Sequence, residues 1–182
     1  KAKHELLQSC VEVITGVCTT VAQARADLAA TVTEVEAAAA GRNLGVLCSG
    51  SHPTTHWSTQ RISAGERYRM LVERNQRMAQ QLQIFGVHVH VGVRSEDKVM
   101  PIVNALLDYV PHFLALSASS PFWLGGDTGL ASYRSKIFEG LPTAGLPYQL
   151  HDWDEFERYM ELLIKTGAIE TVREVWWDIR PH

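Results

Sequence analysis

The sequence predicts an α+β fold, in which several helices accompany separate strands. Two observations carry this prediction. Residues 86–92, Gly-Val-His-Val-His-Val-Gly, alternate apolar and polar side chains with the period of a half-buried strand. Residues 20–40 are rich in alanine and place valine and leucine at helical spacing, with Thr19 or Thr20 as the cap and Gly41 after them.

The composition bounds what the chain can do. It has 182 residues, of which 46% are hydrophobic and 20% charged, as expected for one globular domain. The net charge of −3 creates no strong field for nucleic acid or an anionic membrane. No apolar run reaches the roughly 18 residues of a membrane helix, and no signal peptide is visible. The 3 cysteines show no paired spacing and predict reduced thiols in a cytoplasmic protein.

The first predicted strand covers residues 6–15 and carries Glu12 inside an apolar run. A carboxylate there is costly unless it is paired, binds a metal or faces water. An exposed strand face with Glu12 in solvent is an equally open interpretation. On one straight strand Glu5 would lie about 23 Å from Glu12, on the opposite face. The two can therefore share a site only if the chain bends between them.

The next elements alternate between scaffold and loop. The helix over 20–40 is scaffold, and residues 44–48 predict a short buried strand. Residues 50–63 form a polar loop whose histidines and tryptophan suit a cleft wall as well as an ordinary loop. Residues 64–84 predict a helix whose charged faces are typical of solvated surface. One or two of its arginines could still reach a phosphate, and we select Arg69 and Arg74.

The segment 86–92 holds the first candidate site. On a strand its valines face one side, while His88 and His90 lie on the other, about 7 Å apart. Two neutral imidazoles on one face can ligate a metal or contact phosphate. Two surface histidines are the alternative interpretation. The flanking glycines favour the first, because they allow backbone or ligand to approach closely.

The remaining chain predicts two helices, a long loop and a last strand. Ser95 caps a helix that runs to about residue 117, and Asp152 opens another that Gly167 ends. Between them, residues 119–150 are irregular but too hydrophobic to be disordered. A long, ordered loop of this kind is typical of a cleft lid. Arg134 lies in this loop. Residues 175–179 predict a final strand, followed by Arg180.

The motifs exclude several common sites. The sequence has no Gly-x-Ser-x-Gly elbow, no phosphate-binding P-loop and no His-Glu-x-x-His pair. Glu12, the two histidines and Arg180 fit a metal–phosphate site better than a hydrolytic triad.

Six ordered motifs resemble the glutamate–cysteine ligase family 2, the bacterial carboxylate–amine ligases. They are Glu-Leu-Leu at 5–7 with Val-Glu-Val-Ile-Thr-Gly-Val-Cys at 11–18, the segment 86–92, Ser-Ala-Ser-Ser-Pro-Phe-Trp at 117–123, Tyr-Arg-Ser at 133–135, Gly-Leu-Pro at 145–147 and Trp-Asp-Ile-Arg-Pro-His at 177–182.

The resemblance implies a fold and a reaction. The fold is glutamine-synthetase-like, with a largely antiparallel curved sheet and helices on one face. ATP phosphorylates the γ-carboxylate of glutamate, and cysteine or another amine displaces the phosphate. Two or three Mg²⁺ or Mn²⁺ ions hold the phosphates. The implied partners are these small substrates and a second copy of the chain, with no nucleic acid and no membrane.

The resemblance also assigns residues. Glu5, Glu12 and His88 match metal ligands, and Arg134 and Arg180 match catalytic positions. His90 joins Arg69 and Arg74 as a nucleotide-binding candidate. Residues 1–182 would form a single catalytic domain, an excerpt that lacks strands at both ends.

Two other functions stay open. A non-catalytic binding or assembly member of the same fold would bind neither metal nor nucleotide. A zinc hydrolase using His88 and His90 would hold Zn²⁺ tightly, although a third ligand at suitable spacing is not evident. Mg²⁺-dependent use of ATP would identify the ligase. The sequence does not identify the amine acceptor.

Overall fold

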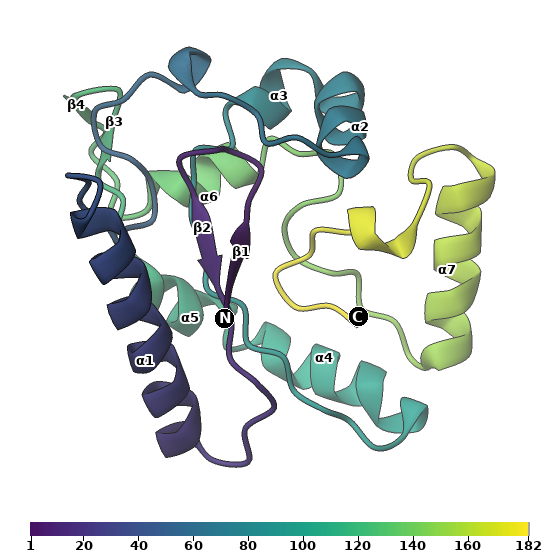
Figure 1. Cartoon of the computed structure of the whole chain (residues 1–182). Helices are drawn as coiled ribbons and strands as arrows, with labels where there is room; N and C mark the ends of the chain where they lie inside the picture. The colour runs from purple at the N-terminus through teal and green to yellow at the C-terminus, as the bar shows by residue number, and fades with distance from the viewer. Residues whose placement is uncertain (182) are drawn as a thin grey trace. The chain divides into compact units, whose positions relative to one another are not determined.

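The computed structural model describes residues 1–181 (Figure 1). The chain divides into two compact units. Unit 1 comprises residues 1–49 and 55–83, and unit 2 comprises residues 50–54 and the chain from residue 84 onward. Each unit combines helices with one short antiparallel strand pair, which agrees with the predicted α+β class. The described residues hold two such pairs, so the large curved sheet stays a prediction.

Unit 1 begins with a hairpin. Strand β1 (Ala2–His4) pairs with β2 (Val11–Val13), and Lys3 lies opposite Glu12. The predicted strand over 6–15 is therefore wrong in its length, because the chain turns back between the two strands. Leu7 is buried in this turn and is bridged to Ile62. The chain thus bends between Glu5 and Glu12.

Helix α1 (Val21–Ala40) confirms the predicted scaffold helix. The hydroxyl of Thr20 accepts a hydrogen bond from the backbone N–H of Gln23 at 3.2 Å, which caps the first turn. Gly41 follows the helix with a φ of −62°, so its role does not depend on a left-handed conformation.

The helix predicted over 64–84 is two helices, α2 (Glu66–Asn75) and α3 (Arg77–Gln80). Gln76 separates them with φ 49° and ψ −126°, a conformation that cannot continue the helical hydrogen bonds. The short helix η1 (Trp57–Thr59) lies in the polar loop before them, and the guanidinium of Arg77 lies 5.4 Å from the Trp57 ring centroid.

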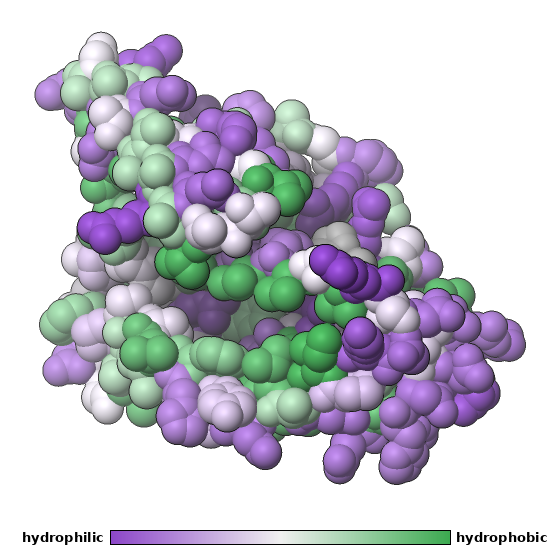
Figure 2. All heavy atoms as spheres, turned by 90° about the horizontal axis from the view of Figure 1, so that it is seen from below, coloured by the Kyte–Doolittle hydropathy of each residue, from purple (hydrophilic) through white to green (hydrophobic). Residues whose placement is uncertain are grey.

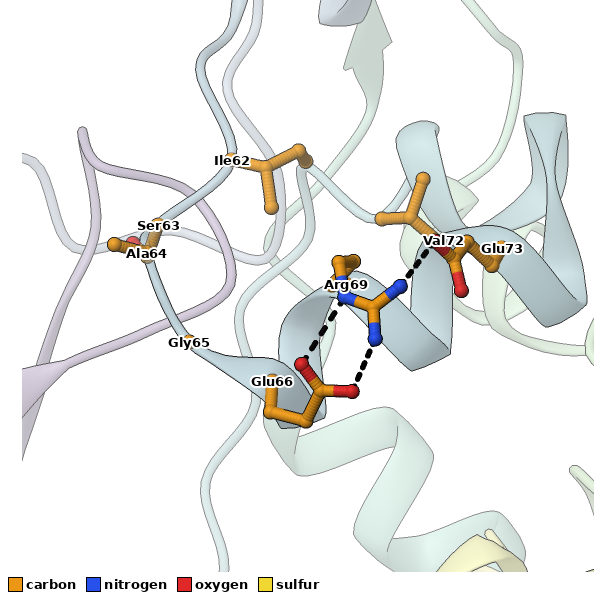
Figure 3. Close-up of a pocket in the computed structure, with 8 residues that line it drawn as sticks. All are labelled: Ile62, Ser63, Ala64, Gly65, Glu66, Arg69, Val72 and Glu73. Carbon is orange, nitrogen blue, oxygen red and sulfur yellow. Dashed lines mark hydrogen bonds and ion pairs between the residues drawn. The ribbon is translucent and has the colours of Figure 1, made fainter.

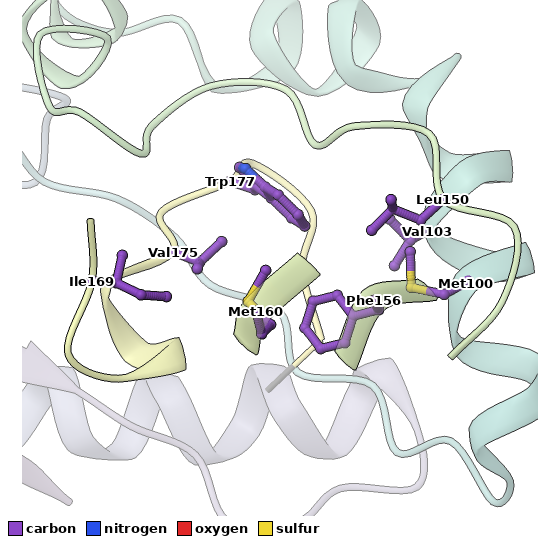
Figure 4. Close-up of a cluster of buried hydrophobic side chains, with 8 residues drawn as sticks. All are labelled: Met100, Val103, Leu150, Phe156, Met160, Ile169, Val175 and Trp177. Carbon is purple, nitrogen blue, oxygen red and sulfur yellow. The ribbon is translucent and has the colours of Figure 1, made fainter. Parts of the chain in front are cut away.

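Unit 2 is built on one apolar core, shared chiefly by α4 (Val99–Leu107) and α7 (Trp153–Lys165) (Figure 4). The two helices contribute side chains at helical spacing, and the chain after α7 adds residues from irregular backbone. The buried members of this core are Met100, Val103, Leu150, Phe156, Met160, Ile169, Val175 and Trp177.

The helix predicted from Ser95 to residue 117 is broken. It consists of η2 (Glu96–Lys98), α4 and α5 (Val110–Ser117), and the Ser95 side chain makes no capping hydrogen bond. The axis bends by 64° between residues 107 and 110. In residues 1–181, no single helix has the length and apolar character to cross a membrane; residues 96–107 and 110–117 reach both only when taken together.

The long loop over 119–150 contains structure that its sequence does not predict. Strands β3 (Phe122–Trp123) and β4 (Gly126–Asp127) form a hairpin, and α6 (Tyr133–Phe138) follows it. The final strand predicted over 175–179, after η3 (Val172–Glu174), is wrong in its extent, because only Trp177 is bridged, to Gly145.

Two other predicted strands are also wrong in the described chain. Residues 44–48 are exposed and have no regular secondary structure, and residues 86–92 form no ladder. A strand needs a neighbour for its backbone groups, and here pairing ends at the bridge between Ile84 and Ser51. Val87 and Val89 are consequently 88% and 83% exposed. Figure 2 shows a face on which apolar side chains reach the surface beside polar ones.

Candidate functional site

Arg134 is held at the first turn of α6. Its backbone N–H donates to the hydroxyl of Ser120 at 3.1 Å. The N–H of Tyr133 donates to the carbonyl of Ser120 at 3.0 Å, and Ser120 is buried. One serine from outside the helix therefore satisfies two of the N–H groups that a helix start leaves unpaired.

The guanidinium of Arg134 is half-buried. Its Cζ atom lies 5.3 Å from the Phe138 ring centroid, and its Nη2 atom lies 2.7 Å from where a Cβ on Gly86 would stand. Within residues 1–181, its Nε atom is buried and has no hydrogen-bond partner. Burial lowers the pKa of Arg134 below its ordinary value, and the charge of Asp178 opposes this shift.

Asp178 and Arg180 come from the chain just after the core residue Trp177. The backbone N–H of Asp178 donates to the carbonyl of Gly145 at 2.8 Å. Nη1 of Arg180 donates to the carbonyl of Trp177 at 3.2 Å. Burial lowers the pKa of Arg180, and Asp178 opposes that shift as well. Desolvation raises the pKa of Asp178, although Arg134 and Arg180 attract its charged form.

We call Arg134, Asp178 and Arg180 the guanidinium cluster. The charge of Asp178 acts on both arginines that the sequence selects as catalytic, which lie 46 residues apart in the chain, and the three groups carry one surplus positive charge. Guanidinium groups present forks of N–H donors that match carboxylate and phosphoryl oxygens. The cluster is therefore suited to an anionic oxygen group.

The histidine segment, residues 87–91, follows Gly86 directly. The rings of His88 and His90 have centroids 6.4 Å apart, close to the separation that the alternating pattern predicts. The contact between Gly86 and the Arg134 guanidinium places the start of this segment against the cluster.

The predicted carboxylate ligands belong to unit 1. Glu12 forms an ion pair with Lys3, with Nζ 2.9 Å from Oε2, which supplies one of the partners that a carboxylate in an apolar run needs. Oε2 of Glu5 accepts the N–H of Leu6 at 2.9 Å. Carboxylates and imidazoles suit divalent cations, yet over residues 1–181 no three His, Cys, Asp or Glu side chains gather around a common point. A metal site is thus not assembled from the residues that the structure describes.

Arg69 lines a pocket of about 510 Å³ in unit 1, beside α2 (Figure 3). Its guanidinium is paired with the carboxylates of Glu66 and Glu73, the latter at 2.7 Å. These two partners raise the pKa of Arg69 further above its ordinary value. Arg74, in the last turn of the same helix, is not among the pocket's lining residues. Nucleotide binding by either arginine stays a prediction.

Sequence reasoning missed Asp178, Ser120 and the guanidinium that lies against Gly86, although it expected a close approach at that glycine. Asp178 carries a weak signal, because it stands two residues from Arg180 in a run that otherwise reads as a strand. Ser120 and Gly86 act through contacts between segments that are distant in the chain, and no local sequence pattern predicts such contacts.

Comparison with known proteins supplies the family. A model described as glutamate–cysteine ligase family 2 matches residues 1–182. Curated relatives include two proteins named provisionally as glutamate–cysteine ligase 2-1. The protein of Frankia alni is 65% identical over 100% of this chain and 48% of its own length. The protein of Mycolicibacterium vanbaalenii is 50% identical over 100% of this chain and 48% of its own length. A protein of Thermobifida fusca, named provisionally as glutamate–cysteine ligase 2, is 54% identical over 99% of this chain and 45% of its own length. The chain spans about half the length of these relatives.

Proposed function

The chain belongs to the glutamate–cysteine ligase family 2, and from this premise we propose that its protein is an ATP-dependent carboxylate–amine ligase. The reaction joins the γ-carboxylate of glutamate to the amino group of cysteine or of another amine. The observation that carries the proposal is the guanidinium cluster, in which the charge of Asp178 acts on Arg134 and Arg180 and the three groups retain a surplus positive charge.

The reaction has two steps, each of which moves negative charge between oxygens. A γ-carboxylate oxygen of glutamate attacks the γ-phosphorus of ATP and releases ADP, which leaves a γ-glutamyl phosphate. The amine nitrogen then attacks the carbonyl carbon, phosphate departs with the bonding electrons, and the nitrogen loses a proton. Fixed guanidinium groups aimed at those oxygens stabilise the charge that develops, without reorganising during the reaction.

Arg134 and Arg180 are the groups of this chain that we assign to the anionic oxygens. The buried Nε–H of Arg134 supports this assignment, because a buried donor without a partner is costly and a bound oxygen would satisfy it. His90, Arg69 and Arg74 are the nucleotide-binding candidates of the same proposal.

Mg²⁺ or Mn²⁺ belongs to the proposal as the companion of ATP, whose phosphate charges it would neutralise. Glu5, Glu12 and His88 are the ligands that we nominate from the family resemblance. The described residues do not gather into a metal site, so we assign no reaction step to a metal ion.

Neither alternative has comparable support. The relatives named above carry a ligase name, which disfavours a purely structural member of the family. A zinc hydrolase needs three protein ligands, and residues 1–181 do not gather three around His88 and His90.

Isotope transfer tests the proposal. The full-length protein is incubated with ATP, Mg²⁺, cysteine and glutamate that carries ¹⁸O in its γ-carboxylate. The phosphate released should contain one ¹⁸O per turnover, because one carboxylate oxygen leaves with the phosphoryl group. Omitting the amine is the control, since the acyl phosphate then lacks its acceptor.

Two results would contradict the ligase. One is ADP formation that is independent of glutamate. The other is amide formation with unlabelled phosphate, which would require a different activated species. A panel of amines in place of cysteine identifies the acceptor.

A further inference from the structure

Gly86 lies against the guanidinium of Arg134. A Cβ atom at position 86 would stand 2.7 Å from Nη2 and 3.5 Å from Cζ of Arg134, whereas ordinary van der Waals contact begins at 3.4 Å. Gly86 is not among the glycines with a positive φ, so its backbone conformation would accept alanine. What position 86 requires is therefore room for the guanidinium, and the glycine supplies it.

The backbone on both sides of this contact is restrained. The N–H of Phe85 donates to the carbonyl of Gly50 at 2.9 Å, and the N–H of Gly50 donates to the carbonyl of Ser119 at 3.2 Å. The hydroxyl of the next residue, Ser120, accepts the N–H of Arg134 at 3.1 Å. Gly50 thus joins the chain on the glycine side of the contact to the chain that holds Arg134.

Gly50 is itself closely packed. A Cβ atom there would lie 3.0 Å from both Cβ and Oγ of Ser120, a residue that is 2% exposed. So close a crossing leaves the backbone little room to move. A methyl group added at position 86 would therefore displace the flexible end of the Arg134 side chain rather than the backbone.

Packing also places the rest of the guanidinium. The Cζ atom of Arg134 lies 5.3 Å from the ring centroid of Phe138, and among residues 1–181 its buried Nε atom has no hydrogen-bond partner. Because no hydrogen bond at Nε fixes the group, its position depends on the space that Gly86 and Phe138 leave. The same unpaired Nε–H is a donor that a bound oxygen would satisfy.

We propose that Gly86 is a positioning residue, whose missing side chain lets the Arg134 guanidinium lie where it binds an anionic oxygen group of a substrate. The inference rests on the proposed function and goes beyond it by assigning a role to Gly86. Carboxylate and phosphoryl oxygens share the chemistry that a guanidinium recognises. The oxygen group belongs either to glutamate or to ATP, and the experiment separates the two.

Gly86→Ala in the full-length protein moves the guanidinium without changing any charge. Binding of glutamate and binding of ATP with Mg²⁺ are measured separately by calorimetry. The affinity for one of them should fall by about tenfold, which corresponds to the loss of one charge-assisted contact. Gly92→Ala is the matched control, because a Cβ there meets no atom within 4 Å, and its affinities should stay within about twofold of the natural protein.

A double-mutant cycle separates positioning from a general change in structure. Arg134→Ala removes the atoms that the new methyl group would meet. In that background Gly86→Ala should change the affinity by less than about twofold, because the two sites act through one contact. If Gly86→Ala alone does not fold, urea unfolding of the double variant decides. Recovery of the folded state supports the steric contact, and continued failure to fold contradicts it.

The outcomes are separable from those of the ligase proposal. Loss of affinity for glutamate assigns the guanidinium to its carboxylate, and loss for ATP assigns it to phosphate. The inference is overturned if Gly86→Ala binds both as Gly92→Ala does, or if its loss persists undiminished in the Arg134→Ala background. If the full-length protein forms no amide with any amine, the ligase proposal fails, and the binding measurements still decide the role of Gly86.

Discussion

The indole of Trp177 stacks on the phenol ring of Tyr159, with centroids 6.0 Å apart and planes inclined by 20°. Tyr159 lies on α7, and Trp177 lies in the irregular chain that follows it. This contact ties the backbone that leads to Asp178 and Arg180 to the core of unit 2. The packing of the unit 2 core therefore restrains the backbone at Asp178 and Arg180.

Trp177→Ala should destabilise the protein strongly. The side chain is 5% exposed and contacts three aromatic rings, so its removal leaves a cavity and should cost about 3–5 kcal/mol. Urea unfolding measures the loss. Phe122→Ala is the control, because that ring is 48% exposed and should cost less than about 1 kcal/mol. Equal losses would contradict the central place of Trp177.

The pKa of Asp178 predicts a pH dependence of stability. Burial raises the pKa of Asp178 in the folded protein above its value in the unfolded chain. At any pH between these two pKa values, the folded state keeps a proton that the unfolded state releases. This carboxyl group therefore contributes less stability as the pH rises through that range. Asp178→Asn should be at least as stable as the natural protein at about pH 7, and should lose that advantage below about pH 4.

The measurement is the difference in free energy of unfolding between the two proteins, taken across this range. The charges that act on Asp178 are those of Arg134, Arg180 and Glu139. If the difference instead grew in favour of Asp178→Asn on acidification, the sign of the shift would be wrong.

Arg134→Ala should weaken catalysis without unfolding the protein. The guanidinium is replaced by a methyl group while the backbone contact to Ser120 remains, so α6 should persist. We expect kcat/KM to fall by well over about tenfold. Arg134→Lys should rescue little, because an ammonium lacks the planar fork. Unchanged kinetics in the full-length protein would remove Arg134 from the site.

The N-cap of α7 gives a local prediction. Oδ1 of Asp152 accepts the N–H of Glu155 at 2.8 Å, so Asp152→Ala should cost about 1 kcal/mol. Ser95→Ala should cost less than about 0.5 kcal/mol, because Ser95 makes no side-chain cap hydrogen bond. Thermal unfolding of the two variants checks the contrast, and a reversed order would contradict the capping geometry.

Local signals predict the local structure well. Thr20 and Asp152 cap their helices as expected, and Gly167 follows α7 with a φ of +73°, where a residue without Cβ is favoured. Each of these features depends on residues within one helical turn. The sequence therefore contains all the information that sets them.

Pairing and distant contacts are not predicted in this way. The alternation in residues 87–91 correctly predicts the separation of the two imidazoles, but a strand also needs a neighbour, which a single segment does not specify. The helix breaks at Gln76 and near Asp108 interrupt sequences whose local pattern is continuous and helical, so the pattern does not predict them. The charge of Asp178 acts on Arg134 only through the fold, because 44 residues separate them in the chain, so chemistry alone selects the arginine and misses the aspartate.

The exposed valines of the histidine segment have a consequence for handling the protein. Val87, Val89, Val91 and Val93 alternate along a stretch without Asp, Glu, Lys, Arg or proline, and all four reach solvent. Such stretches pair edge to edge between molecules and seed fibrillar aggregates. Concentrated solutions of this chain should therefore scatter light in a concentration-dependent way. Val89→Lys would place a charge in this stretch, oppose pairing between molecules and slow the aggregation of concentrated solutions.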